Sequence, residues 1–72
     1  GKQINGVIVV IIKKFSHSII NDFINDFCIK ENEIEKIRFR PPSIEMKNGI
    51  TFRFETSLQR LRGMLLNGVL FY

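Results

Sequence analysis

Six consecutive residues near the start of the chain are all apolar: Val7-Ile8-Val9-Val10-Ile11-Ile12. A strand with one solvated face alternates apolar and polar residues, so an unbroken Val/Ile run is typical of a strand covered on both faces. A buried helix segment has the same composition but usually extends over about ten residues or more. Asn5-Gly6 and Lys13-Lys14 bound the run. We therefore predict a central strand over residues 7–12, parallel to at least one neighbour.

A long amphipathic helix is predicted next, beginning after Phe15 and ending near Lys30. Ser16 is expected to be its N-cap, with Phe15 and Ile20 packing across the cap as a hydrophobic staple. Asn and Asp residues occupy the polar face of this helix. The apolar face is formed by residues with the spacing of one helical stripe, namely Ile19, Ile20, Phe23, Ile24, Phe27 and Cys28.

Three alternating segments follow the helix and a polar connector. Residues 36–40 alternate apolar and basic side chains, which predicts a half-exposed strand whose Phe39 faces the core. Pro41-Pro42 ends this strand because proline cannot donate to a ladder. Residues 44–47 and 50–55 alternate in the same way around Asn48-Gly49, and this arrangement predicts a hairpin.

The register of the hairpin follows from its pattern. A two-residue loop at Asn48-Gly49 would place charged residues opposite apolar ones on the same face. A three-residue loop over residues 47–49 instead pairs Ile44 with Phe52 and keeps the apolar residues together. Since a slip of one residue turns every side chain to the other face, we predict the longer loop, with Gly49 in a left-handed conformation.

The chain closes with a short predicted helix and a final strand. Thr56 to Gln59 matches a capping box, and residues 69–72 form an apolar strand that we expect to run parallel to the first. The predicted order is strand, helix, three strands, helix, strand. The expected fold class is α/β, with α+β as the alternative: a small mixed sheet of about four or five strands with one long amphipathic helix and one short helix.

The length and composition bound the kind of protein. The 72 residues are expected to form one small domain over residues 1–72. The single cysteine excludes an internal disulfide framework and is typical of a reducing compartment. No apolar run approaches the length of about 20 residues that a helix needs to cross a bilayer. We therefore expect a soluble, cytoplasmic protein that does not contact membranes.

The net charge of +4 is unevenly distributed and predicts the candidate contact surface. Acidic residues concentrate in residues 22–35 and basic residues in residues 36–62. This asymmetry is compatible with contact to a nucleic-acid backbone, with a protein partner, or with an ordinary solvated surface. Oligomerisation through a sheet edge also stays open. The predicted contact residues are Lys36, Arg38, Arg40, Arg53, Arg60 and Arg62.

The sequence contains no recognisable catalytic, cofactor or metal site. His17 is the only histidine and is read as a surface residue at a helix start. Cys28 lies on the apolar helical stripe, where a small buried hydrophobe is the expected role. Asp22 and Asp26 share one helix face without a second acidic pair. We therefore expect a protein that is not an enzyme and that needs no cofactor or metal.

The order of several short motifs resembles a segment of the ATPase domain of phage terminase large subunits, which are DNA-packaging motors. In that family the segment lies between the phosphate loop and the Walker B acids. A hydrophobic strand enters a Ser-rich helix start, an Asn-Gly hairpin follows, and an Arg-Gly step precedes a hydrophobic strand. The corresponding stretches here are residues 7–14, 15–28, 44–52, 61–63 and 69–72.

The resemblance implies a small phage-type protein, or part of a larger ATPase domain, that is associated with nucleic acid in a host cytoplasm. Gly1-Lys2 is not followed by the Ser or Thr of a phosphate loop, and no Walker B acids follow residue 72 in this sequence. Hydrolysis of ATP by this chain alone is therefore not expected. The alternative function is a protein-binding module, such as a phage-encoded inhibitor of a host defence nuclease of the anti-CRISPR kind.

Overall fold

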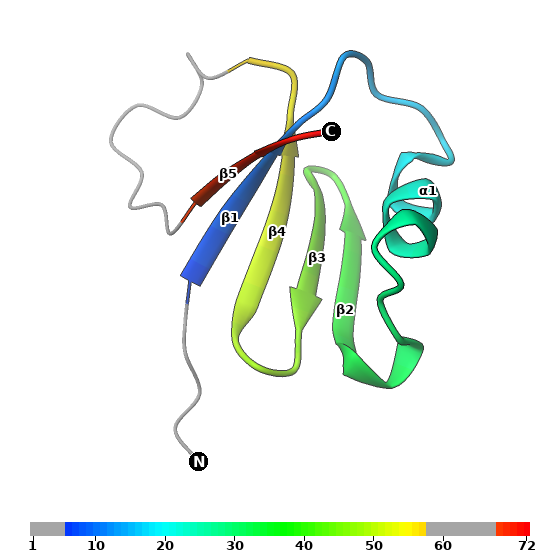
Figure 1. Cartoon of the computed structure of the whole chain (residues 1–72), viewed down its shortest axis with the longest axis vertical. Coiled ribbons are helices and arrows are strands. Elements are labelled where there is room, and N and C mark those ends of the chain that lie inside the picture. Colours follow the sequence, from blue (N-terminus) through cyan, green and yellow to red (C-terminus); the bar gives the residue numbers. More distant parts are fainter. Residues whose placement is uncertain (1–5, 58–67) are drawn as a thin grey trace.

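A computed structural model describes residues 6–57 and 68–72 (Figure 1). The chain forms a mixed sheet with one helix. The elements in chain order are β1 (Gly6–Ile11), α1 (Ile19–Asp26), a 3-10 turn (Glu31–Glu33), β2 (Ile34–Phe39), β3 (Pro42–Met46), β4 (Ile50–Glu55) and β5 (Gly68–Phe71).

The sheet is centred on the Val/Ile run, as predicted. Its strand order is β2-β3-β4-β1-β5, and β1 runs parallel to both β4 and β5. The side chains of Val9 and Val10 are both 0% exposed. Since neighbouring residues of a strand point to opposite faces, the middle of β1 is covered on both faces. The prediction of a central, parallel strand is confirmed.

The β3–β4 hairpin has the predicted register. Ile44 pairs with Phe52 across the two strands. Gly49 has a φ of 95°, and its N–H donates to the carbonyl of Met46 at 3.1 Å. The side chain of Asn48 accepts the N–H of Ile50 at 3.0 Å, which closes the other side of the turn. The loop thus spans three residues and uses glycine where the backbone is left-handed.

The core lies between α1 and one face of the sheet, called here the helix side. Its buried residues come from β1, the start of the loop that follows it, α1, β3 and β4, and Phe23 of α1 is its aromatic centre. The ring of Phe23 meets that of Phe54 edge to face at a centroid distance of 5.2 Å and that of Tyr72 at 5.5 Å. The buried cluster comprises Val10, Ile12, Ile20, Phe23, Ile44 and Phe54.

The helix begins later than predicted. Ser16 forms a turn instead of a cap, because its carbonyl accepts the N–H of Ile19 at 3.3 Å. Ser18 occupies the N-cap position but makes no side-chain cap, since its hydroxyl donates to Asp22 at 3.3 Å. The predicted start at Ser16 is therefore wrong, and residues 12–18 form a loop between β1 and α1.

The helix also ends earlier than predicted, at Asp26. Cys28 has a φ of 53°, its N–H donates to Asn25 at 3.3 Å, and the N–H of Ile29 donates to Ile24 at 3.0 Å. These two bonds form a Schellman motif, in which a left-handed residue ends a helix. The helix has eight residues, so the expectation of a long helix is corrected to a short one.

The fold class is α+β-like, the alternative left open by the sequence. β2, β3 and β4 form an antiparallel meander, and only β1 contributes parallel pairs, to β4 and β5. A mixed sheet of five strands is thus confirmed. The predicted second helix falls mostly on residues 58–67, which lie outside the described part of the chain.

Candidate functional site

Three of the predicted contact residues share the sheet face opposite the helix side. Arg38 pairs with Ser43, and Ser43 pairs in turn with Arg53, so both arginines stand in one cross-strand row. Lys36 is directly opposite Glu45. The predicted grouping of these three basic residues therefore agrees with the register of the sheet.

Acidic neighbours compensate much of the charge on this face. The Nε of Arg38 lies 3.6 Å from a carboxylate oxygen of Glu45, and the Nε of Arg53 donates to Glu55 at 3.1 Å. Glu55 is buried, so its carboxylate is held close to Arg53. Three basic and two acidic side chains thus share the face among the described residues. This surface is less basic than the sequence predicted.

The other three predicted contact residues lie elsewhere. β2 ends at Phe39, and Arg40 belongs to the turn between β2 and β3. Arg40 lines a pocket with residues of α1 and of the helix side. The expectation that it points the same way as Lys36 and Arg38 is therefore wrong. Arg60 and Arg62 lie outside the described residues.

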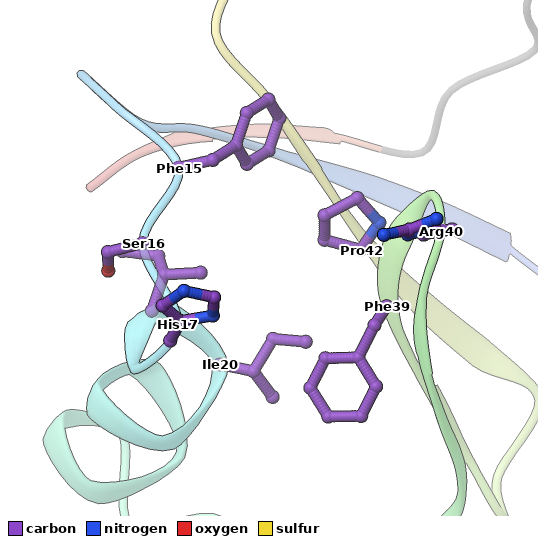
Figure 2. Close-up of a pocket in the computed structure, with 8 residues that line it drawn as sticks. Phe15, Ser16, His17, Ile20, Phe39, Arg40 and Pro42 are labelled. Atoms are coloured by element: carbon purple, nitrogen blue, oxygen red, sulfur yellow. The ribbon is translucent and has the colours of Figure 1, made fainter.

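The pocket that Arg40 lines has a volume of about 470 Å³. Its lining comes from the loop of residues 12–18, from α1 and from the end of the β2–β3 hairpin. The loop and the β2–β3 turn both lie at the end of the sheet where β1 and β4 finish (Figure 1). Figure 2 shows the rings of Phe15 and Phe39 on either side of the hollow, with His17 on the α1 side. The lining residues are Phe15, Ser16, His17, Ile19, Ile20, Phe39, Arg40 and Pro42.

The short helix explains why this pocket exists. Because α1 begins at Ile19, the preceding residues form a loop, and that loop supplies Phe15, Ser16 and His17 to the pocket wall. Phe39 pairs with Pro42 at the end of the β2–β3 hairpin and is 68% exposed. Alternation placed Phe39 correctly on the helix side, but the expectation that it is buried in the core is wrong.

The chemistry of the pocket is aromatic and cationic. Its described lining contains one guanidinium, one imidazole, one hydroxyl and two exposed aromatic rings, and none of these residues is acidic. Lys13 and Lys14 are exposed in the same loop. Among the described residues, Arg40 and the two lysines form no ion pair with a carboxylate, in contrast to Arg38 and Arg53. The positive charge beside this pocket is thus not neutralised by an ion pair within the described residues.

Sequence reasoning missed this grouping, although its parts were visible. Lys13-Lys14-Phe15 and Phe39-Arg40 each place cations beside an aromatic residue, and both occur at a predicted strand end. These two strand ends lie at the same end of the sheet only because β2 pairs with β3, β3 with β4, and β4 with β1. A second hollow, of about 240 Å³ and lined by Glu35 and Lys47 among others, carries both signs of charge.

The remaining candidate groups form no reactive site among the described residues. Cys28 is exposed at the helix end, so its expected burial in the core is wrong. No three His, Cys, Asp or Glu residues in residues 6–57 and 68–72 are arranged to hold a metal ion. The hydroxyl of Tyr72 donates to Asp26, and this hydrogen bond to a carboxylate raises the pKa of Tyr72 to about 12.

Comparisons with family models, curated proteins and solved structures each gave no match to this chain. No helix in the described residues combines the length and the apolar composition needed to span a bilayer.

Proposed function

We propose that this chain is a non-catalytic, nucleic-acid-associated module whose contact surface is the loop of residues 12–18 together with Arg40. The observation that carries the proposal is the charge around the pocket. Lys13, Lys14 and Arg40 are exposed and have no described carboxylate partner, whereas two of the sheet-face cations are paired with acids. Uncompensated cations gain most from a polyanion, because they neutralise phosphates and release the counterions bound there.

The salt dependence of DNA binding tests this proposal. If the three cations each neutralise one phosphate of a duplex, the slope of log K against log salt concentration is about −2.7, at about 0.9 per contact. The affinity then falls about 40-fold between about 50 and 200 mM salt. Fluorescence anisotropy with labelled DNA measures the affinity at each salt concentration. Absence of binding to both duplex and single-stranded DNA at low salt would contradict the proposal.

Charge reversal at Arg40 tests which surface makes the contact. We expect Arg40→Glu to weaken binding about equally for all DNA sequences and to reduce the salt slope by about 1, because one phosphate contact is lost. Lys30→Glu is the matched control, since Lys30 is also exposed but follows α1, outside the pocket. An equal loss in both variants would show that only net charge matters and would remove Arg40 from the contact surface.

The relationship to terminase ATPase domains is a further part of the proposal. The order of strand, helix, strands and a last strand parallel to the first is compatible with that segment. The source gene provides the test. An Asp-Glu pair encoded directly after Tyr72 would support the relationship, and its absence there would argue against it.

A protein-binding module is the second candidate, and the exposed side chains of β5 favour it. Val69 is 41% exposed and Phe71 is 72% exposed, and β5 is the last strand in the described sheet. An exposed apolar strand at a sheet edge can add a strand from a partner. If the chain inhibits a host defence nuclease in this way, it lowers DNA cleavage by that nuclease and Phe71→Ser restores cleavage. Unchanged cleavage across such nucleases would reject this candidate.

A further inference from the structure

We infer that the pocket beside Arg40 accepts an unstacked base of a single-stranded nucleic acid, with Phe15 and Phe39 as the stacking surfaces. This inference rests on the proposed function and specifies its ligand. A contact to the backbone alone needs only cations. The pocket adds two aromatic rings that are 40% and 68% exposed, at Phe15 and Phe39 respectively, in a hollow otherwise walled by the side chains of residues such as Ile20 and Pro42 (Figure 2).

The volume of the pocket and the placement of its two rings are suited to an aromatic ligand. Phe15 comes from the loop after β1 and Phe39 from the end of β2, so the two rings approach the hollow from different elements (Figure 2). The volume of about 470 Å³ lies within the range of about 300–1,000 Å³ that is typical of small-ligand sites. A base that enters can stack on either ring, and stacking of this kind tolerates any base because each has a π-face.

The charge around the pocket narrows the chemical class of its ligand further. Each base of a nucleic acid is carried on a sugar that phosphodiesters link to its neighbours, so a base-binding hollow is favoured by a cation at its rim and disfavoured by an acid in its wall. Arg40 supplies a guanidinium that can bind a phosphate with two N–H groups, and the described wall contains no carboxylate. His17 and Ser16 add hydrogen-bond donors on the opposite wall. Single-strand binding sites commonly combine aromatic platforms with such cations.

Single-stranded nucleic acid is favoured over a duplex because paired bases are already stacked on each other and cannot enter a hollow. An acidic peptide would satisfy Arg40 but would leave both exposed rings without a flat partner. We therefore expect the chain to bind an oligothymidylate of 12 nucleotides more tightly than a duplex of the same length. We also expect it to bind tighter than a 12-unit abasic strand, which has the same phosphates but no bases.

The decisive experiment compares these three ligands by fluorescence anisotropy in low salt, with the full chain and three single variants. Phe39→Leu keeps an apolar side chain but removes the ring, and we expect it to weaken oligothymidylate binding about tenfold while leaving abasic-strand binding unchanged. Phe27→Leu is the control, because Phe27 is 47% exposed yet lies outside the pocket. Circular dichroism establishes that each variant is folded, and Phe15→Leu serves as a second test of the same wall.

The outcomes separate the two proposals. If none of the three ligands binds, the proposed function and this inference both fail. If oligothymidylate and abasic strand bind equally, and Phe39→Leu and Phe15→Leu have no effect while Arg40→Glu weakens binding, backbone contact stands and base stacking is wrong. If a labelled acidic peptide binds to the chain through Arg40 and oligothymidylate does not bind, the partner is a protein and the inference is also wrong. Only selective loss of base-dependent binding in the ring variants supports it.

Discussion

At the scale of single residues, the backbone at Cys28 limits stability. Its φ of 53° is left-handed, which costs an L-residue roughly 1–2 kcal/mol and costs glycine little. Cys28 is exposed, so little packing is lost when it is replaced. After the extra chain entropy of glycine is subtracted, we expect Cys28→Gly to raise the free energy of unfolding by about 0.5–1 kcal/mol in urea titrations. Cys28→Ser is the control, and a less stable Cys28→Gly would contradict the Schellman assignment.

The opposite substitution is informative at Gly49. A side chain there would have to adopt a φ of 95° while the N–H keeps its bond to Met46. We expect Gly49→Ala to lower the free energy of unfolding by about 1–2 kcal/mol. Gly68→Ala is the matched control, because a Cβ at Gly68 meets nothing within 4 Å and its backbone is not left-handed. Equal effects of the two variants in urea unfolding would show that the turn does not require glycine.

At the scale of elements, the contact between Tyr72 and Asp26 joins the end of β5 to α1. The pKa of Tyr72 is raised from 10.0 to about 12, so the folded chain holds the phenolic proton more tightly than the unfolded chain. The contribution of this bond to stability is therefore complete below pH 10 and is lost as the pH rises towards 12. Tyr72→Phe should lack this loss.

Two measurements check the titration of Tyr72. Urea unfolding at several pH values compares the original chain with Tyr72→Phe, and we expect the two stability curves to converge in the alkaline range. Because the chain has one tyrosine, its ultraviolet absorbance reports the ionisation of Tyr72 directly. Parallel stability curves, or an absorbance midpoint at the ordinary tyrosine value, would show that the hydroxyl does not bind Asp26 in solution.

The sequence predicted the strands better than the helix for a physical reason. The hairpin strands and the pairing of Ile44 with Phe52 follow from the alternation of apolar and polar side chains. Each residue of these strands fits that alternation, so many positions support the same register. The ends of α1 depend instead on single local bonds. Ser16 and Ser18 are equally good cap candidates by composition, and the turn that Ser16 closes with Ile19 decides between them. The pocket could not be predicted for the same reason, because part of its wall is the loop before α1, and the longer predicted helix would have included those residues.

At the scale of the whole molecule, the sheet face that carries Lys36, Arg38 and Arg53 is less basic than a count of its cations predicts, because acidic side chains pair with two of them. Arg53 and Glu55 are two residues apart on one strand, so their shared face could be read from the sequence. The pairing of Arg38 with Glu45 depends on how β2 and β3 align around Arg40, which the sequence did not specify. Lys13, Lys14 and Arg40 lie in a loop and a turn and form no such ion pair among the described residues. For this reason we place the candidate contact surface at the end of the sheet and not on its face.

The position of β5 in the sheet has a kinetic consequence. Ile8 pairs with Gly68, so the edge of β1 that faces β5 finds its neighbour only after sixty further residues have been synthesised. Until then a nascent Val/Ile ribbon presents unpaired amide and carbonyl groups to any other extended chain. Such distant pairing slows folding, and an incomplete chain is correspondingly prone to self-association on or off the ribosome.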